Sequence, residues 1–263
     1  MDELDVKIFR ALASESAVVP LNLQIHSSLI DIARRLGIDD TTVNYRYKKL
    51  QDAGVMSAWK LAINPTYFGY RMMIMLVDVH PESAKRDMIR KLKSVPGVVV
   101  IGNFFGKAMN VMFLYDGDES CSSTAKLISR ITNAEKVTLH RMALPKSETK
   151  QLTKTELDII RDLSDDARKP YALVAKELGL STRTVRNRIE KLRRERTFYA
   201  MPSLRISEIP GIIPVYLSYS YANKEVKRSV DQNMLSHFDG NYLWVGFSDP
   251  ENGFFGPKRT DHG

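Results

Sequence analysis

The chain has 263 residues, of which 43% are hydrophobic and 27% are charged, and its formal net charge at pH 7 is +8. This composition is globular and excludes a disordered or fibrous chain, while the length predicts at least two domains. The positive charge favours a polyanionic partner such as nucleic acid or anionic lipid. We expect no membrane span, because the best apolar run, from Gly211 to Tyr221, is short and contains Pro214.

The first residues of the sequence and its cysteine content both predict a cytoplasmic location. The chain opens with Met1-Asp2-Glu3 and lacks the basic start and apolar stretch of a secretory signal. Cys121 is the only cysteine, so an internal disulfide cannot form. A reducing compartment suits both features.

Residues 1–65 predict a winged helix-turn-helix domain, the first module. Its opening helix begins at Glu3 and ends near Leu12, and residues 56–63 predict a short hairpin or wing at its end. Extra residues, around 17–26, separate the opening helix from the next one.

Three residues define the helix-turn-helix motif of this module. Ala33 stands where two helices must cross closely, and Gly37 allows a left-handed backbone at the turn. Val43 gives the following helix an apolar anchor. A DNA-binding helix-turn-helix requires this spacing.

Residues 66–147 predict a ferredoxin-like domain with the element order βαββαβ. The predicted strands and helices, in chain order, are a strand at 71–79, a helix at 81–93, strands at 98–105 and 109–115, a helix at 119–131 and a strand at 136–144. One face of such a sheet is left without helices and commonly needs a partner.

Residues 148–208 repeat the first module. The segment from Ala33 to Leu50 matches the segment from Ala175 to Leu192 without a gap, and the opening helices correspond with Glu3 aligned to Glu156. Thr153 with Glu156 forms a capping-box pattern ahead of this second module. Asp39 and Ser181 are the expected N-caps of the two recognition helices.

Residues 209–263 predict a partial second ferredoxin-like domain. A strand at 212–221, a helix at 224–238 and a strand at 242–247 repeat the start of the first sheet. The segment 249–263 is rich in Gly, Pro and charge, so we expect the pattern to stop there, with no second helix or fourth strand. The fold class is therefore α+β, with both domain types repeated and the second sheet domain incomplete.

The exposed face of each recognition helix carries residue types that bind phosphates and base edges. The candidate DNA-binding residues of the first module are Thr41, Thr42, Asn44, Tyr45, Lys48 and Lys49. Those of the second module are Thr182, Arg183, Thr184, Arg186, Asn187, Lys191, Arg193 and Arg194. The second set is more basic, so we expect it to bind the phosphate backbone more strongly.

Within the second set we assign two roles. Arg183, Arg186 and Asn187 are predicted to read base edges, and Lys191, Arg193 and Arg194 to hold phosphates. The alternative is that each module makes only protein contacts and that its charges form an ordinary solvated helix face.

The chain resembles the Lrp/AsnC family of transcription regulators. The resemblance rests on Leu4-Asp5-Val6-Lys7-Ile8, on the turns Leu36-Gly37-Ile38 and Leu178-Gly179-Leu180, on the Thr-Val pairs that follow these turns, and on Val95-Pro96-Gly97-Val98. It covers nearly all of the first 145 residues and, more loosely, residues 153–247.

This resemblance implies a sequence-specific regulator that binds double-stranded DNA through its recognition helices. It also implies a dimer or larger homo-oligomer built through the ferredoxin-like domains, and an amino acid or related effector bound between them. The chain departs from the family pattern by its duplication and by the loop Gly102–Lys107, which lacks the aspartate that members often carry there. We therefore assign no effector-binding residues.

Two other functions stay open. Siroheme decarboxylases resemble Lrp/AsnC proteins in fold, and His80, His140 and His237 are the histidines available for such chemistry, although their spacing forms no recognisable constellation. A protein-protein assembly factor that has lost DNA binding is the other. Because no catalytic motif or Cys/His cluster stands out, we expect no enzyme activity, cofactor or metal.

Overall fold

The structure is a computed structural model that describes residues 2–13, 29–142, 144–148, 150–204, 215–220, 245–246 and 252–258, together with isolated residues between 226 and 237. It divides into two compact units. One comprises residues 1–64, 146–246 and 253–263, and the other comprises residues 65–145 and 247–252. Both helix-turn-helix modules thus lie in one unit and the ferredoxin-like domain in the other.

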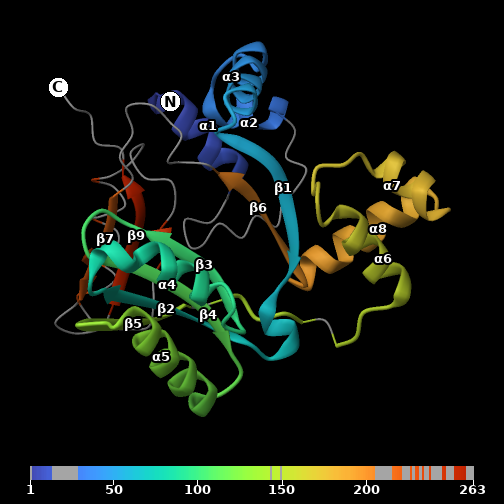
Figure 1. Ribbon diagram of the computed structural model, residues 1–263. Helices are drawn as coiled ribbons and strands as arrows, with labels where there is room; N and C mark the ends of the chain where they lie inside the picture. The colour runs from blue at the N-terminus through green and yellow to red at the C-terminus, as the bar shows by residue number, and fades with distance from the viewer. Residues whose placement is uncertain are drawn as a thin grey trace. The chain divides into compact units, whose positions relative to one another are not determined.

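Each module is a bundle of helices (Figure 1). The first contains α1 (Glu3–Ala13), α2 (Leu29–Leu36) and α3 (Asp40–Asp52), and the second contains α6 (Lys154–Leu163), α7 (Tyr171–Leu178) and α8 (Thr182–Arg194). The apolar stripes of these helices form the two small cores. The residues buried at their centres are Ile8, Ile32 and Val43 in the first module and Ile159, Val174 and Val185 in the second.

The predicted glycine turns are confirmed in both modules. Gly37 and Gly179 each have a φ of +65°, in the left-handed region that glycine adopts most readily. Ala33 and Ala175 are buried, and their carbonyls accept hydrogen bonds from the amides just after each turn, at 3.1 Å and 2.8 Å. The turn therefore fixes the angle at which each recognition helix, α3 or α8, leaves the preceding helix.

Residues 56–63 were predicted to be a short hairpin or wing, and the hairpin alternative is wrong. These residues form one continuous strand, β1 (Met56–Ile63), which pairs antiparallel with β6 (Phe198–Leu204) from the other module (Figure 1). A local turn is unnecessary because the second module supplies the partner strand. The wing strands of the two modules thus form a two-stranded ribbon.

Further backbone hydrogen bonds join β1 to the second module. The Ala167 amide donates to the Trp59 carbonyl at 2.7 Å, and the Leu61 amide donates to the Ser164 carbonyl at 3.1 Å. Trp59 is buried at this junction. The modules are consequently parts of one packed unit, joined by more than the chain itself.

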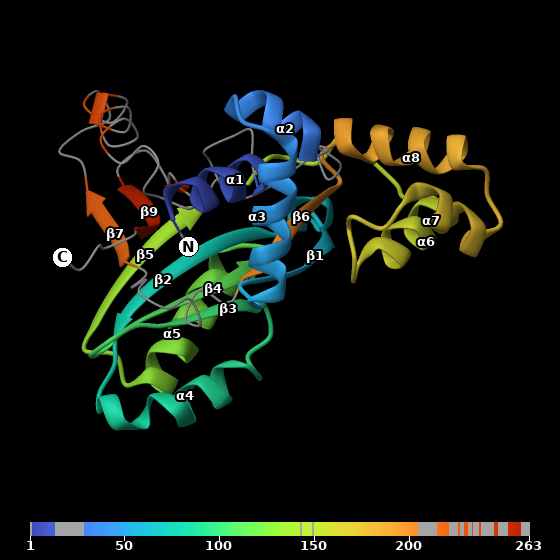
Figure 2. The same cartoon turned by 90° about the horizontal axis from the view of Figure 1, so that it is seen from above.

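The ferredoxin-like domain has the predicted topology. Its elements are β2 (Arg71–Asp78), α4 (Lys85–Leu92), β3 (Val98–Asn103), β4 (Ala108–Tyr115), α5 (Asp118–Thr132) and β5 (Lys136–Met142), with 3₁₀ turns at Pro65–Phe68 and Glu82–Ala84. The antiparallel sheet has the order β3-β4-β2-β5. Helices α4 and α5 cover the same face, where Met75, Val111 and Phe113 are buried (Figure 2).

The last part of the chain contains one strand more than its composition predicts. The three strands β7 (Val215–Ser220), β8 (Val245–Gly246) and β9 (Asn252–Lys258) form a sheet in the order β7-β9-β8, the order of β2-β4-β3 in the first sheet. The expectation that the pattern stops after residue 247 is therefore wrong, because β9 adds a third strand. Phe255 pairs with Val245, and Phe254 pairs with Gly246 of β8. The Gly and Pro residues around these two aromatic residues favour a loop in the sequence, so the strand was not predicted. The helix predicted at 224–238 lies almost wholly outside the described residues.

None of the helices within the described ranges has the length and apolar character needed to cross a membrane.

Candidate nucleic-acid interface

The recognition helix of the second module, α8, is apolar on one face and basic on the other. Val185, Ile189 and Leu192 are buried against the rest of the module. The predicted residues that lie exposed are Thr182, Arg183, Arg186, Asn187 and Arg194, whereas Thr184, Lys191 and Arg193 are half-buried. The structure thus brings Arg183, Arg186 and Asn187 to one solvent-facing surface at the start of the helix.

The recognition helix of the first module, α3, presents a different surface. Thr41, Asn44, Tyr45, Lys48 and Lys49 are exposed and Thr42 is half-buried. The Tyr45 side chain is 66% exposed, which is unusual for a large aromatic residue. The Asn44 side-chain amide donates to the Asp40 carbonyl at 2.8 Å, so its nitrogen is partly occupied.

Charge separates the two helices clearly. Helix α8 contains six Lys or Arg residues and one acidic residue, whereas α3 contains three Lys or Arg residues and two acidic ones. Polyanion binding depends on cations at the surface, so α8 has the stronger electrostatic basis for contacting DNA.

Both recognition helices begin at the predicted caps. The Asp39 carboxylate accepts from the Thr41 amide at 2.9 Å, and the Ser181 hydroxyl accepts from the Thr184 amide at 3.0 Å. These side chains satisfy donors that a helix start would otherwise leave free. The first turn of each recognition helix, which would enter a DNA groove, is therefore fixed in place.

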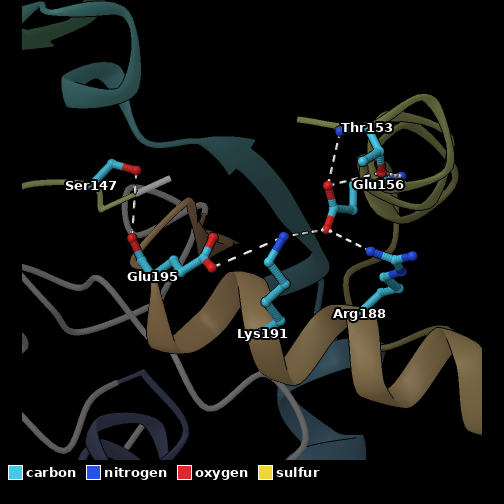
Figure 3. Close-up of polar contacts among 6 residues, drawn as sticks. All are labelled: Ser147, Thr153, Glu156, Arg188, Lys191 and Glu195. Carbon is cyan, nitrogen blue, oxygen red and sulfur yellow. Dashed lines mark hydrogen bonds and ion pairs between the residues drawn. The ribbon is translucent and has the colours of Figure 1, made fainter. Parts of the chain in front are cut away.

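A buried carboxylate joins α8 to α6 (Figure 3). Glu156 is 0% exposed and completes the predicted capping box with Thr153, whose amide donates to its Oε2 at 2.8 Å. Its other oxygen, Oε1, accepts from Lys191 at 2.9 Å and from Arg188 at 3.3 Å. The carboxylate thus connects the start of α6 to the middle of α8.

This set of partners also determines the charge of Glu156. Burial disfavours the charged form, but hydrogen bonds from Thr153 and Lys191 outweigh it and lower the pKa from 4.5 to about 2. Glu156 therefore stays ionised at neutral pH and keeps the two cations of α8 in position.

The first module contains the same arrangement, which the sequence alignment missed. Asp2 and Asp5 cap each other's amides at 2.9 Å and 3.0 Å, and buried Asp5 accepts from Arg46 of α3 at 3.2 Å. Asp5 is therefore the counterpart of Glu156, and the predicted alignment of Glu3 with Glu156 is wrong by two residues. Aligning the capping pairs Asp2–Asp5 and Thr153–Glu156, instead of the shared Glu-Leu-Asp sequence, identifies this correspondence.

Lys191 lies at this buried site rather than free on the helix surface. Its ammonium group is 2.9 Å from Glu156 Oε1 and 4.0 Å from Glu195 Oε1. The assignment of Lys191 as a phosphate ligand stays a prediction. In the structure its ammonium group contacts carboxylates of the protein itself.

The histidines considered for decarboxylase chemistry are not brought together in the ferredoxin-like domain. His80 follows the end of β2 and lies 3.4 Å from Glu135, whereas His140 is buried on β5 opposite Ile74. These positions are roughly 13 Å apart or more along the strands, given about 3.3 Å per residue. Within the described ranges no three His, Cys, Asp or Glu residues are grouped as a metal site would require.

A buried lysine binds the backbone around the loop Gly102–Lys107, which lacks the aspartate that Lrp/AsnC members often carry there. The buried Lys85 ammonium donates to the carbonyls of Phe104 at 2.8 Å, Ala108 at 3.0 Å and Gly106. Desolvation lowers the pKa of Lys85. The loop's carbonyls are thus held by the protein's own cation.

Comparison with known domains agrees with this geometry. The AsnC-type helix-turn-helix domain family matches residues 152–193, and the winged helix-turn-helix DNA-binding family matches residues 26–55. The fold and these matches define a protein with tandem winged helix-turn-helix domains.

The relatives similar to this chain are named as transcriptional regulators. The chain is 29% identical over 140 residues to the HTH-type transcriptional regulator LrpA of Pyrococcus horikoshii, covering 52% of this chain and 92% of that protein. It is 28% identical over 143 residues to the HTH-type transcriptional regulator Ptr1 of Methanocaldococcus jannaschii, covering 53% of this chain and 90% of that protein. Over about half of its length the chain is thus similar to HTH-type transcriptional regulators.

A solved structure matches the whole length of the chain. The siroheme decarboxylase NirDL has a TM-score of 0.52 and 16% identity, covering 100% of this chain and 83% of that one. At this identity the similarity concerns the fold alone.

Proposed function

We propose that the chain is a sequence-specific, DNA-binding transcription regulator of the Lrp/AsnC type. The observation that carries this proposal is the exposed basic face of α8, where Arg183 and Arg186 stand beside Asn187. The names of the curated relatives LrpA and Ptr1 support it. Arginine suits guanine edges and asparagine suits adenine edges in the major groove, which a helix of this kind can enter.

The roles within α8 follow from position and partners. Arg183, Arg186 and Asn187 lie near the helix start and are proposed to read bases. Arg193 and Arg194 lie in the last turn and are proposed to hold phosphates. In the first module, the residues proposed to make the weaker contacts are Thr41, Thr42, Asn44, Tyr45, Lys48 and Lys49.

Fluorescence anisotropy with the full chain tests this assignment. Arg186→Ala should relax sequence preference, with about 1 to 3 kcal/mol lost at its base, whereas Arg194→Ala should weaken all sequences alike. Arg161→Ala, an exposed α6 arginine paired with Asp158, is the control and should change little. Unchanged DNA affinity at low salt in both α8 variants would overturn the proposal.

Three finer points belong to the same proposal. We expect self-association through the ferredoxin-like domain, as its sheet has edge strands β3 and β5 available for pairing. Regulation by an amino acid or related effector is proposed from the family alone. A cytoplasmic location fits a DNA-binding protein with a single cysteine.

A siroheme-decarboxylase activity is the second candidate, because the NirDL fold spans the entire chain. It would require a tetrapyrrole bound by this protein. The expected result under our proposal is a colourless protein that leaves siroheme unchanged after incubation. Release of carbon dioxide from siroheme would establish the enzyme instead.

A further inference from the structure

The sequences of the two modules align residue by residue. From the helix-turn-helix motif onward, each residue of the second copy lies 142 positions after its counterpart, as in Ala33 and Ala175 or Val43 and Val185. The same offset relates Gly54 to Arg196, which both have positive φ values, +67° and +54°. The recognition helices therefore lead into β1 and β6 through the same kind of turn.

The hydrogen bonds of these turns are also the same. In the first module the Ala53 amide donates to Lys49 and the Gly54 amide to Gln51. At the matching positions of the second module the Glu195 amide donates to Lys191 and the Arg196 amide to Arg193. Each recognition helix is consequently attached to its strand in an equivalent way.

The register of the β1–β6 ribbon is reciprocal under this offset. Trp59 pairs with Pro202, the counterpart of Lys60, and Lys60 pairs with Met201, the counterpart of Trp59. Such an exchange, in which i contacts j and j contacts i, defines an isologous, two-fold interface.

From Leu61 to Ile63 the ladder continues in the same antiparallel register. Leu61 pairs with Ala200, the counterpart of Ala58, and Ile63 pairs with Phe198, the counterpart of Met56. Beyond the register shift between Met56 and Trp59, Met56 pairs with Leu204, the counterpart of Ala62, so the exchange with Ile63 is off by one residue there. The centre of the ribbon, between Trp59 and Lys60, is thus a local two-fold axis relating two modules of one chain.

The exposed side chains of the two recognition helices do not share the two-fold relation of the ribbon centre. At equivalent exposed positions α3 has Thr41, Asn44 and Asp52 where α8 has Arg183, Arg186 and Arg194. A symmetric pair of recognition helices reads a palindrome, since the symmetry of the DNA site mirrors that of the protein. Unequal helices in a symmetric frame would read inverted half-sites of unequal sequence.

We propose that one copy of this chain reads a complete bipartite DNA site, made of two inverted half-sites that differ in sequence. The half-site under α8 is the stronger one, and the half-site under α3 is the weaker. This inference rests on the proposed function and specifies its DNA substrate. Because both wing strands belong to one ribbon, the spacing between the half-sites has a single allowed value.

Selection of bound duplexes from a random pool by the full chain tests this directly. The expected motif contains two inverted, unequal halves at one spacing. At saturating DNA, mass measurement should give one pair of halves bound per chain, also where chains self-associate. Reversing the orientation of the weak half should lower affinity about tenfold, to that of the strong half alone. Inserting 5 bp between the halves, about half a helical turn, should have the same effect.

Matched variants identify which helix reads which half. Selection with Arg186→Ala should flatten the strong half only, and selection with Asn44→Ala the weak half only. A single half, a direct repeat, or identical halves bound by two chains would overturn the inference and leave DNA binding intact. If no sequence is enriched and no salt-sensitive DNA binding occurs, the proposed function itself fails.

Discussion

The first and second helix-turn-helix modules share a scaffold and differ in the surface they present. Both have a left-handed glycine at the turn, a buried carboxylate that binds an arginine of the recognition helix, and a wing strand in the common ribbon. On the exposed face, Arg183 and Arg186 of α8 correspond to Thr41 and Asn44 of α3. The comparison shows that packing fixes the helix positions, while the outward residues are free to set the affinity of each module.

The largest effect is expected at the buried carboxylate of the second module. Glu156→Ala should destabilise the protein by about 3 to 5 kcal/mol, because it leaves the Thr153 amide and the ion-paired Lys191 and Arg188 without their partner. Urea unfolding measures the loss. The control on the same helix is Asp158→Ala, whose exposed pair with Arg161 should contribute less than about 1 kcal/mol. Equal losses in the two variants would remove the distinction.

Acid should weaken the same contact. The folded pKa of Glu156 lies below its ordinary value of 4.5, at about 2, so its contribution is complete above pH 4.5 and disappears as the pH falls toward 2. That contribution is roughly 3 kcal/mol. The stability of the native chain minus that of Glu156→Gln, measured by urea unfolding across this pH window, should therefore shrink on acidification. A difference independent of pH would show that Glu156 does not titrate as described.

The caps of the two recognition helices should be equivalent in energy. Ser181→Ala and Asp39→Ala each remove one acceptor for a first-turn amide and should each cost about 1 kcal/mol. Thermal unfolding of both variants provides the comparison, with Ser181→Asp as a control that retains a capping oxygen. If only one substitution has an effect, the modules do not share their N-terminal geometry.

The smallest effect is a gain in DNA affinity. Asn44→Arg gives α3 the residue that α8 has at Arg186, and it should tighten DNA binding by a few tenths to about 1 kcal/mol while steepening the salt dependence by about one ion. Anisotropy at several salt concentrations measures both. Ser122→Arg, which adds the same charge on α5 of the ferredoxin-like domain, should do neither.

The sequence predicts those parts of the fold that local spacing determines. The intervals between Ala33, Gly37 and Val43 are sufficient to place the helices and the turn, and the caps Asp39 and Ser181 occur where expected. The order of strands and helices from residue 71 to 142 likewise identifies the ferredoxin-like topology. Each of these features depends on residues close together in the chain.

The features that were missed depend on distant partners. The sequence of β1 predicts a short hairpin or wing without its partner, because β6 lies far along the chain and no turn residue marks the pairing. The match of Asp5 with Glu156 was missed because the two acids differ in length and perform the same capping role two positions away from the aligned letters. The DNA-contacting roles of the exposed residues remain predictions, since exposure alone does not select a ligand.

The salt dependence of DNA binding tests the central claim most directly. The full chain should be compared with two triple variants, Arg183→Ala/Arg186→Ala/Arg194→Ala in α8 and Thr41→Ala/Asn44→Ala/Asp52→Ala at the equivalent positions of α3. We expect the slope of log affinity against log salt to fall by about 1 in the first variant, because Arg194 holds a phosphate, and not to fall in the second. An equal loss in both, or a larger loss in the α3 variant, would contradict it.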